Sequence, residues 1–176
     1  FSFLTCLQQS VMNLGILMVQ TRVNTFGPVV MAAFSTGVKI DAFAYMPLQD
    51  YGNAFSTFTA QNFGAGKEER IKRGMKIAFI TSLLFSIMIS LIVFIASPSL
   101  MKIFVGESER EIIDIGTGYL RIEGAFYALI GFLFLFYGLF RAIGKPGMSF
   151  VLTIISLGTR VLLSYTISDI PSVGVL

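Results

Sequence analysis

Two stretches of this sequence are long, apolar and free of charge, and they limit what the chain can fold into. Residues 1–21 and 77–101 contain no Asp, Glu, Lys or Arg. A helix needs about 20 mostly apolar residues to cross the hydrocarbon core of a bilayer, so each stretch is long enough. Of the 176 residues, 55% are hydrophobic and 13% are charged, whereas a soluble domain carries roughly 25% charge. Because a small soluble fold leaves much of its surface exposed, we predict an all-α, polytopic membrane helix bundle.

About five transmembrane helices are predicted from the apolar stretches and the residues that separate them. Glycine and proline end the helices at Gly27-Pro28, around residues 64–66 and around residues 144–147. Pro47 lies inside the second span and is expected to kink it, because proline removes one backbone hydrogen bond. The chain begins and ends in apolar sequence, so we expect a piece of a longer protein. The predicted spans are residues 1–21, 29–63, 71–104, 112–143 and 148–168.

The charged residues indicate how the spans are oriented. Basic residues gather in the loop after the second span and in the loop after the fourth span, whereas residues 102–114 also hold several acids. Cytoplasmic loops of membrane proteins carry an excess of Lys and Arg, so both basic loops are predicted to lie in the cytoplasm. The net charge of +3 is small, and no basic run suggests a nucleic-acid partner. The basic residues of the two loops are Lys67, Arg70, Lys72, Arg73, Lys76, Arg141 and Lys145.

Two stripes of polar residues follow helical spacing inside the first two spans. Such groups are costly against lipid, so we expect them to face other helices or a wet cavity. Hydrogen bonding between helices is the simpler interpretation for the amides of the first stripe. The first stripe is Gln9, Asn13, Gln20 and Asn24, and the second is Lys39, Phe43, Met46, Asp50, Asn53, Thr57 and Gln61.

Asp50 is the member of the second stripe for which we predict a role in transport. An ionised carboxylate inside a span is expensive and is usually paired or bound to a cation. Pro47 lies three residues earlier and can leave a backbone carbonyl without a donor. Asp50 near such a carbonyl is a candidate for binding Na⁺ or a proton. The alternative is a neutral, structural Asp50 bonded to an amide of the first span.

Four further residues inside the spans are candidates for the ion or substrate pathway. Asp41 lies two residues from Lys39, so these two side chains point to nearly opposite faces and cannot pair well along their own helix. Glu123 and Tyr127 share one face of the fourth span, although Glu123 could instead lie at the membrane interface. Arg160 lies in the middle of the fifth span, where a lone arginine usually pairs with a carboxylate or lines water, unless the span is shifted or tilted.

The familiar catalytic and metal-binding patterns are missing from the sequence. The chain has no His and a single Cys, so the usual Ser-His-Asp triad and thiolate metal clusters are excluded. The Gly64-Ala65-Gly66-Lys67-Glu68 segment lacks both the glycine spacing of a phosphate loop and the Ser or Thr that follows its lysine. We therefore predict that the chain is not an enzyme and binds no metal or organic cofactor.

Several segments resemble the multidrug and toxic compound extrusion (MATE) family of antiporters. The most specific segment is Ala60-Gln61-Asn62-Phe63-Gly64-Ala65-Gly66-Lys67, where a Gly-Ala-Gly turn precedes basic residues. The other matching segments are residues 7–13, 23–27, 31–34, 46–47 and 140–146. The resemblance implies twelve helices in two six-helix lobes, with this chain supplying helices seven to eleven. The other lobe, at the N-terminal side of the same polypeptide, would be the main partner.

The resemblance also implies a function and a location. Family members export small organic, often cationic, compounds in exchange for Na⁺ or H⁺, with the lobes rocking about a central cavity. Some members carry a coupling Asp in the tenth helix, where Ile130 and Gly131 stand in this chain. The expected location is the membrane of a bacterial cell, with the lipid bilayer as surroundings. Two alternatives stay open: a lipid-linked oligosaccharide flippase and a structural membrane subunit without transport. A flippase would need a strongly basic cavity, for which only Lys39, Arg121 and Arg160 are available in this chain.

Overall fold

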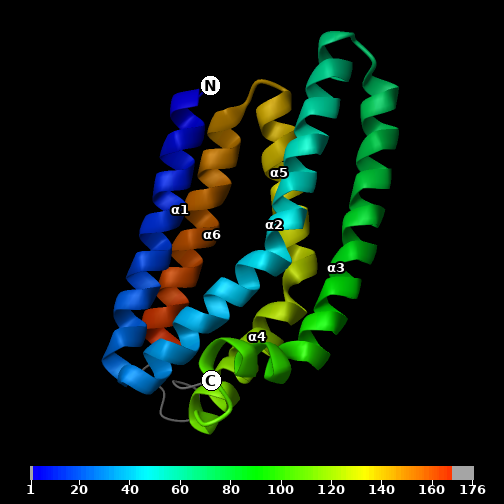
Figure 1. Cartoon of the computed structure of the whole chain (residues 1–176). Helices are drawn as coiled ribbons and strands as arrows, with labels where there is room; N and C mark the ends of the chain where they lie inside the picture. The colour runs from blue at the N-terminus through cyan, green and yellow to red at the C-terminus, as the bar shows by residue number, and fades with distance from the viewer. Residues whose placement is uncertain (1, 168–176) are drawn as a thin grey trace.

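The computed structural model describes residues 2–167, and this part of the chain consists of helices joined by short turns (Figure 1). The prediction of an all-α bundle is confirmed. Phe1 and Ser168, the outer ends of two predicted spans, lie outside the described residues. The elements are α1 (Ser2–Val23), the short η1 (Asn24–Phe26), α2 (Pro28–Gly64), α3 (Glu68–Val105), α4 (Arg110–Ala125), α5 (Tyr127–Ala142) and α6 (Pro146–Ile167).

The predicted fourth span is two helices rather than one. α4 and α5 meet at Phe126 with a bend of 52°. Gly124, a poor helix former, precedes the bend, and the N–H of Phe126 donates to the carbonyl of Glu123 at 2.9 Å. This hydrogen bond reaches back three residues instead of four and tightens the last turn of α4. The single helix predicted for residues 112–143 is therefore corrected to two helices that meet at a bend.

Three of the described helices, α2, α3 and α6, are long and apolar enough to cross a membrane, and the bent α4–α5 pair makes a fourth if it acts as one span. The number of spans that meet this criterion in the described residues is thus lower than the predicted five. α1 has 22 residues, so its length is sufficient. Its hydropathy is lowered by its four amide side chains, Gln8, Gln9, Asn13 and Gln20.

The helices form two groups that lie side by side. α1 packs along α6, while α2 packs against α5, α4 and α3 (Figure 1). Contacts of α6 with α5 and of α1 with α2 join the two groups. The main core lies in the second group and includes Leu48, Met101, Leu120 and Tyr127, all fully buried. Pro47 lies inside α2, and the ribbon of α2 changes direction in its middle (Figure 1).

Glycines let α2 and α5 cross with their backbones in contact. A Cβ added to Gly52 of α2 would lie 2.8 Å from the carbonyl oxygen of Phe134 in α5. A Cβ added to Gly138 of α5 would overlap the carbonyl oxygen of Gly52. Small residues at such crossings are the usual means by which membrane helices approach closely. This crossing fixes α5, and with it Tyr127, against α2.

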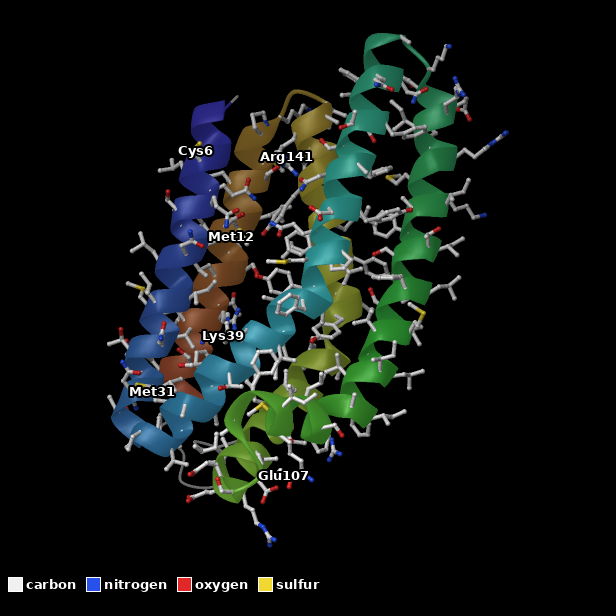
Figure 2. All side chains as sticks on the ribbon, viewed as in Figure 1. Cys6, Met12, Met31, Lys39, Glu107 and Arg141 are labelled. Carbon is white, nitrogen blue, oxygen red and sulfur yellow. The ribbon has the colours of Figure 1, made fainter. Side chains whose placement is uncertain are left out.

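The two basic loops lie at the same end of the bundle. The α2–α3 turn, the α5–α6 connection and the start of α1 are together at the top of Figure 1, and the α3–α4 connection is at the bottom. Figure 2 likewise shows Arg141 and Cys6 at one end and Glu107 at the other. This arrangement agrees with the prediction that both basic loops lie on the same side of the membrane. The assignment of the basic end to the cytoplasm stays a prediction.

Candidate functional site

A cavity of about 230 Å³ lies between the two groups of helices. α1, α2, α4, α5 and α6 all contribute to its wall. Its lining combines apolar side chains with polar and charged ones. The polar lining residues are Gln9, Asn13, Asp41, Tyr45, Gln49, Tyr119, Glu123, Tyr137, Thr153, Ser156 and Arg160.

Asp41 is the buried carboxylate of this cavity, and its partner is a phenol. Its side chain lies on α2 and is 6% exposed. Tyr127, fully buried at the start of α5, donates its hydroxyl proton to Asp41 Oδ1 at 2.6 Å. The short distance is that expected for a hydroxyl bound to a carboxylate. Lys39, two residues away on α2, is exposed outside the cavity, as the offset of these two residues predicts.

Glu123 and Arg160 form the second charged pair of the cavity and join its two sides. Arg160 Nη2 of α6 lies 3.9 Å from Glu123 Oε1 of α4. The arginine side chain is 45% exposed and the glutamate side chain 23% exposed. A pair at this separation is held mainly by charge attraction. The expectation that Arg160 pairs with a carboxylate is met, and Glu123 lies in the cavity.

The polar stripe of α1 divides between the cavity and the surface. Gln9 and Asn13 line the cavity, whereas Gln20 is half-buried and Asn24 is exposed in η1. Sequence reasoning missed Gln8, the buried amide of this helix. Its Nε2 donates to Thr153 Oγ1 of α6 at 2.8 Å, which ties α1 to α6. Helical spacing could not find Gln8, because it lies one position away from the stripe.

The polar stripe of α2 does not line this cavity, although Asn53 lines a smaller pocket next to it with Gln9 and Gln49. The members of the stripe are exposed on the described part of the chain, with Phe43 at 73%. Asn53 has the clearest contact, since its Oδ1 accepts a hydrogen bond from Arg141 Nη2 of α5 at 2.8 Å. This Arg141–Asn53 contact was not predicted. The exposed members of the stripe are Lys39, Phe43, Met46, Asp50, Asn53, Thr57 and Gln61.

The structure changes one part of the argument for Asp50. The carbonyl that loses its donor to Pro47 belongs to the residue four positions earlier, Phe43. Phe43 and Asp50 are seven residues apart on α2, about 10 Å along the helix. Asp50 is exposed and distant from that carbonyl, so its predicted role in transport is set against that of Asp41 in the paired substitutions proposed below.

Aromatic rings form much of the remaining cavity wall. Phe34 and Tyr119 meet edge to face with ring centres 5.4 Å apart, and Tyr45 stacks on Phe134 at 6.3 Å. Aromatic faces attract organic cations. The described residues contain no group of three or more His, Cys, Asp or Glu side chains that could hold a metal ion. Chemically, the arrangement offers two separate carboxylates, each with one partner, beside an aromatic surface.

The family model described as MatE matches residues 2–166. The chain belongs to the MatE family. The resemblance seen in the sequence motifs is thereby confirmed. Together with the apolar helices and the bacterial relatives below, membership identifies an integral protein of the bacterial plasma membrane.

Three curated bacterial relatives match this MatE chain. A probable multidrug resistance protein of Bacillus subtilis, YpnP, is 27% identical over 150 residues, which cover 85% of this chain and 33% of the relative. A probable multidrug resistance protein of Thermotoga maritima, NorM, is 26% identical over 157 residues, which cover 89% of this chain and 33% of the relative. A second Bacillus subtilis protein, YoeA, is 23% identical and has the same description, and the match covers 88% of this chain and 33% of the relative. The chain thus spans about one third of their length, and no solved structure matches it.

Proposed function

We propose that this chain is part of one lobe of a multidrug exporter that moves small organic, often cationic, compounds out of the cell in exchange for Na⁺ or H⁺. The names of the relatives and the membership in the MatE family support export of organic compounds. A second lobe of the same polypeptide would complete the transport path. In this proposal the chain carries out no enzymatic reaction and needs no cofactor beyond the exchanged ion.

The observation that carries the proposal is the pair of carboxylates in the small cavity. Pockets that hold drug-sized molecules measure about 300–1,000 Å³, and this cavity measures about 230 Å³. It is therefore better suited to an ion or to one end of a substrate than to a whole drug. Ile130, at the position where some family members carry a coupling Asp, lines the same cavity as Asp41. In this chain α2 supplies a carboxylate to that region instead of α5.

Asp41 can link ion occupancy to helix packing. As a carboxylate it accepts the hydroxyl of Tyr127 and holds α2 to α5. When a proton or Na⁺ binds the Asp41 carboxylate, the hydrogen bond from the Tyr127 hydroxyl weakens, because it is no longer made to a free negative charge. Glu123 and Arg160 join α4 to α6 across the same cavity, so an organic cation competing for Glu123 would loosen that contact.

A matched pair of substitutions tests this assignment. Asp41→Asn keeps the size and an acceptor oxygen but removes the titratable group from the cavity. Asp50→Asn makes the same change on the same helix at an exposed site. We expect Asp41→Asn in the full-length protein to abolish efflux driven by an imposed pH or Na⁺ gradient in membrane vesicles, and Asp50→Asn to retain it.

Two other outcomes of the Asp41→Asn and Asp50→Asn measurements would contradict this assignment. If Asp41→Asn folds and keeps wild-type dependence on both gradients, the cavity carboxylate has no coupling role. If only Asp50→Asn alters the ion dependence, the coupling residue belongs to the exposed stripe of α2. Comparing the pH gradient with the Na⁺ gradient identifies the ion.

The cavity also argues against the flippase alternative. Of the three cations available for binding a diphosphate, Arg160 lines the cavity, whereas Lys39 and Arg121 are exposed outside its lining. Arg160 is itself close to Glu123. A cavity in which the arginine is already compensated by a carboxylate is a poor match for a doubly charged group.

A further inference from the structure

A second hollow lies at the basic end of the bundle, away from the cavity between the helix groups. It measures about 360 Å³ and lies between α2 and the start of α3. Its lining is Phe58 of α2 with Glu69, Arg70, Arg73, Gly74 and Ile77 of α3. We call it the α2–α3 groove. Its residues take no part in the proposed coupling, so the inference below does not depend on the proposed function.

The α2–α3 groove has an apolar floor and a basic rim. The ring of Phe58 packs where Gly74 lacks a side chain, because a Cβ on Gly74 would overlap that ring. Ile77 continues the floor and is 57% exposed. Arg70 and Arg73 lie one turn apart, on the same side of α3 as Gly74 and Ile77.

The two arginines are available to bind an anion. Lys72 Nζ lies 2.9 Å from Glu69 Oε1, so the acid in the groove lining already has a partner. In the part of the chain that the structure describes, neither Arg70 nor Arg73 has a carboxylate partner. Guanidinium groups bind phosphate in a planar, two-point geometry that lysine cannot reproduce. The rim therefore suits a phosphate group.

The depth of the groove in the membrane indicates where that phosphate comes from. An exposed apolar stripe on α3 starts at Ile77 and extends to Ile95, which is 76% exposed. Ser97 and Ser99 separate this stripe from the exposed Ile103 and Phe104 near the end of the helix. At 1.5 Å per residue this stripe is about 27 Å long, close to the roughly 30 Å thickness of the hydrocarbon core. Arg73 and Arg70 lie about 6 and 10 Å beyond Ile77 along the helix. They are thus at the level of the lipid headgroups when the stripe spans the core.

We propose that the α2–α3 groove is a binding site for one anionic phospholipid. The phosphate lies between the guanidinium groups of Arg70 and Arg73, and the start of an acyl chain lies over Phe58 and Ile77. The rest of the acyl chain follows the exposed stripe of α3. Basic pockets between helices at the membrane surface are known to hold anionic lipid headgroups in this manner. A freely dissolved phosphate would not use the apolar floor or the stripe.

The test is a binding measurement in neutral detergent, where there is no charged membrane surface. The full-length protein is titrated with phosphatidylglycerol, with phosphatidylcholine or with inorganic phosphate, and bound molecules are counted by native mass spectrometry. We expect saturable binding of one phosphatidylglycerol at low concentration, weaker binding of phosphatidylcholine, and no binding of phosphate or competition by it. Each arginine near an anionic group contributes about fivefold, so Arg70→Gln with Arg73→Gln should weaken phosphatidylglycerol binding about 30-fold.

The control is the double substitution Lys67→Gln with Lys76→Gln. It removes the same charge from the same segment but leaves the groove lining and the Lys72–Glu69 pair intact. We expect less than about a threefold change in binding, since neither lysine lines the groove. If both double variants weaken binding equally, the attraction is unspecific and the site is refuted.

Two other results would also overturn the proposal. Competition by inorganic phosphate at the same concentration as the lipid would indicate a site for a soluble anion. Unchanged lipid binding in the double arginine variant would show that the groove is not used. If circular dichroism shows that the double variant is misfolded, Arg73→Gln alone is measured. We expect this variant to bind phosphatidylglycerol about fivefold more weakly. Unchanged binding would count against the site.

Discussion

Replacing Gly52 by alanine tests whether close backbone contact holds α2 against α5. An added Cβ would lie 2.8 Å from the carbonyl oxygen of Phe134, and ordinary contacts begin at 3.4 Å. The helices must therefore separate by the difference, about 0.6 Å, because close-packed interiors have no spare room. Forced overpacking costs about 1–3 kcal/mol, while alanine in place of glycine favours a helix by about 0.5–1 kcal/mol. We expect a net loss of about 1 kcal/mol in the free energy of unfolding, the middle of the range of about 0–2.5 kcal/mol that these two effects allow.

The assay is unfolding of the full-length protein in mixed micelles with increasing dodecyl sulfate, followed by circular dichroism. Gly118→Ala is the matched control, because Gly118 lies inside α4 with no atom within 4 Å of an added Cβ. Its expected effect is a gain of up to about 1 kcal/mol from helix propensity. The reasoning predicts that the same chemical change lowers stability at Gly52 and raises it at Gly118. A stability of Gly52→Ala equal to or above that of the wild type would refute it.

Three further predictions concern the cavity and the membrane orientation. Tyr127→Phe leaves Asp41 without its donor and should destabilise the protein by about 1–3 kcal/mol in the same assay; a loss below about 0.5 kcal/mol would mean that the carboxylate finds another partner. Arg160→Gln should lower efflux of organic cations while leaving stability within about 1 kcal/mol, because the pair it breaks is partly exposed; unchanged efflux in vesicles would exclude a transport role. In a cysteine-free background, an impermeant thiol reagent outside intact cells should label a cysteine at Glu109 and spare one at Glu68; labelling at Glu68 would reverse the proposed orientation.

The helices were predictable from sequence because the length of an apolar run is a local property. The end of α2 at Gly64 and the start of α6 at Pro146 are marked by glycine and proline in the loops. The bend at Phe126 was not predicted, since it contains no proline and a single glycine such as Gly124 inside an apolar run is a weak signal for a break. α1 was predicted as a span because it is long and uncharged over residues 1–21, but its amide side chains lower its mean hydropathy, and it is not among the helices that meet the criterion for a span.

The sequence predicted which types of side chain would pair in the cavity, but not which residues pair with which. Helical spacing separates Lys39 from Asp41, and an arginine inside the membrane calls for a carboxylate. That Asp41 meets Tyr127, 86 residues later, depends on the rotation of α2 and α5 about their axes. The close approach of α2 and α5 at Gly52 and Gly138 is one contact that constrains this rotation, and it too joins residues far apart in the sequence. The stripe containing Asp50 has the same helical rhythm as a buried face, yet the structure leaves it exposed.

The bend at Phe126 separates two residues that are close in sequence but belong to different parts of the cavity. Glu123 is in the last turn of α4, and Tyr127 is the first residue of α5. α5 has 16 residues, so it forms a lever arm of about 24 Å that starts at this point. A rotation of α5 by about 5° about Phe126 displaces its far end, where Arg141 contacts Asn53, by about 2 Å. Such a rotation must also open the Gly52–Gly138 crossing, so a change at the Asp41–Tyr127 bond reaches the opposite end of the helix only if that crossing separates.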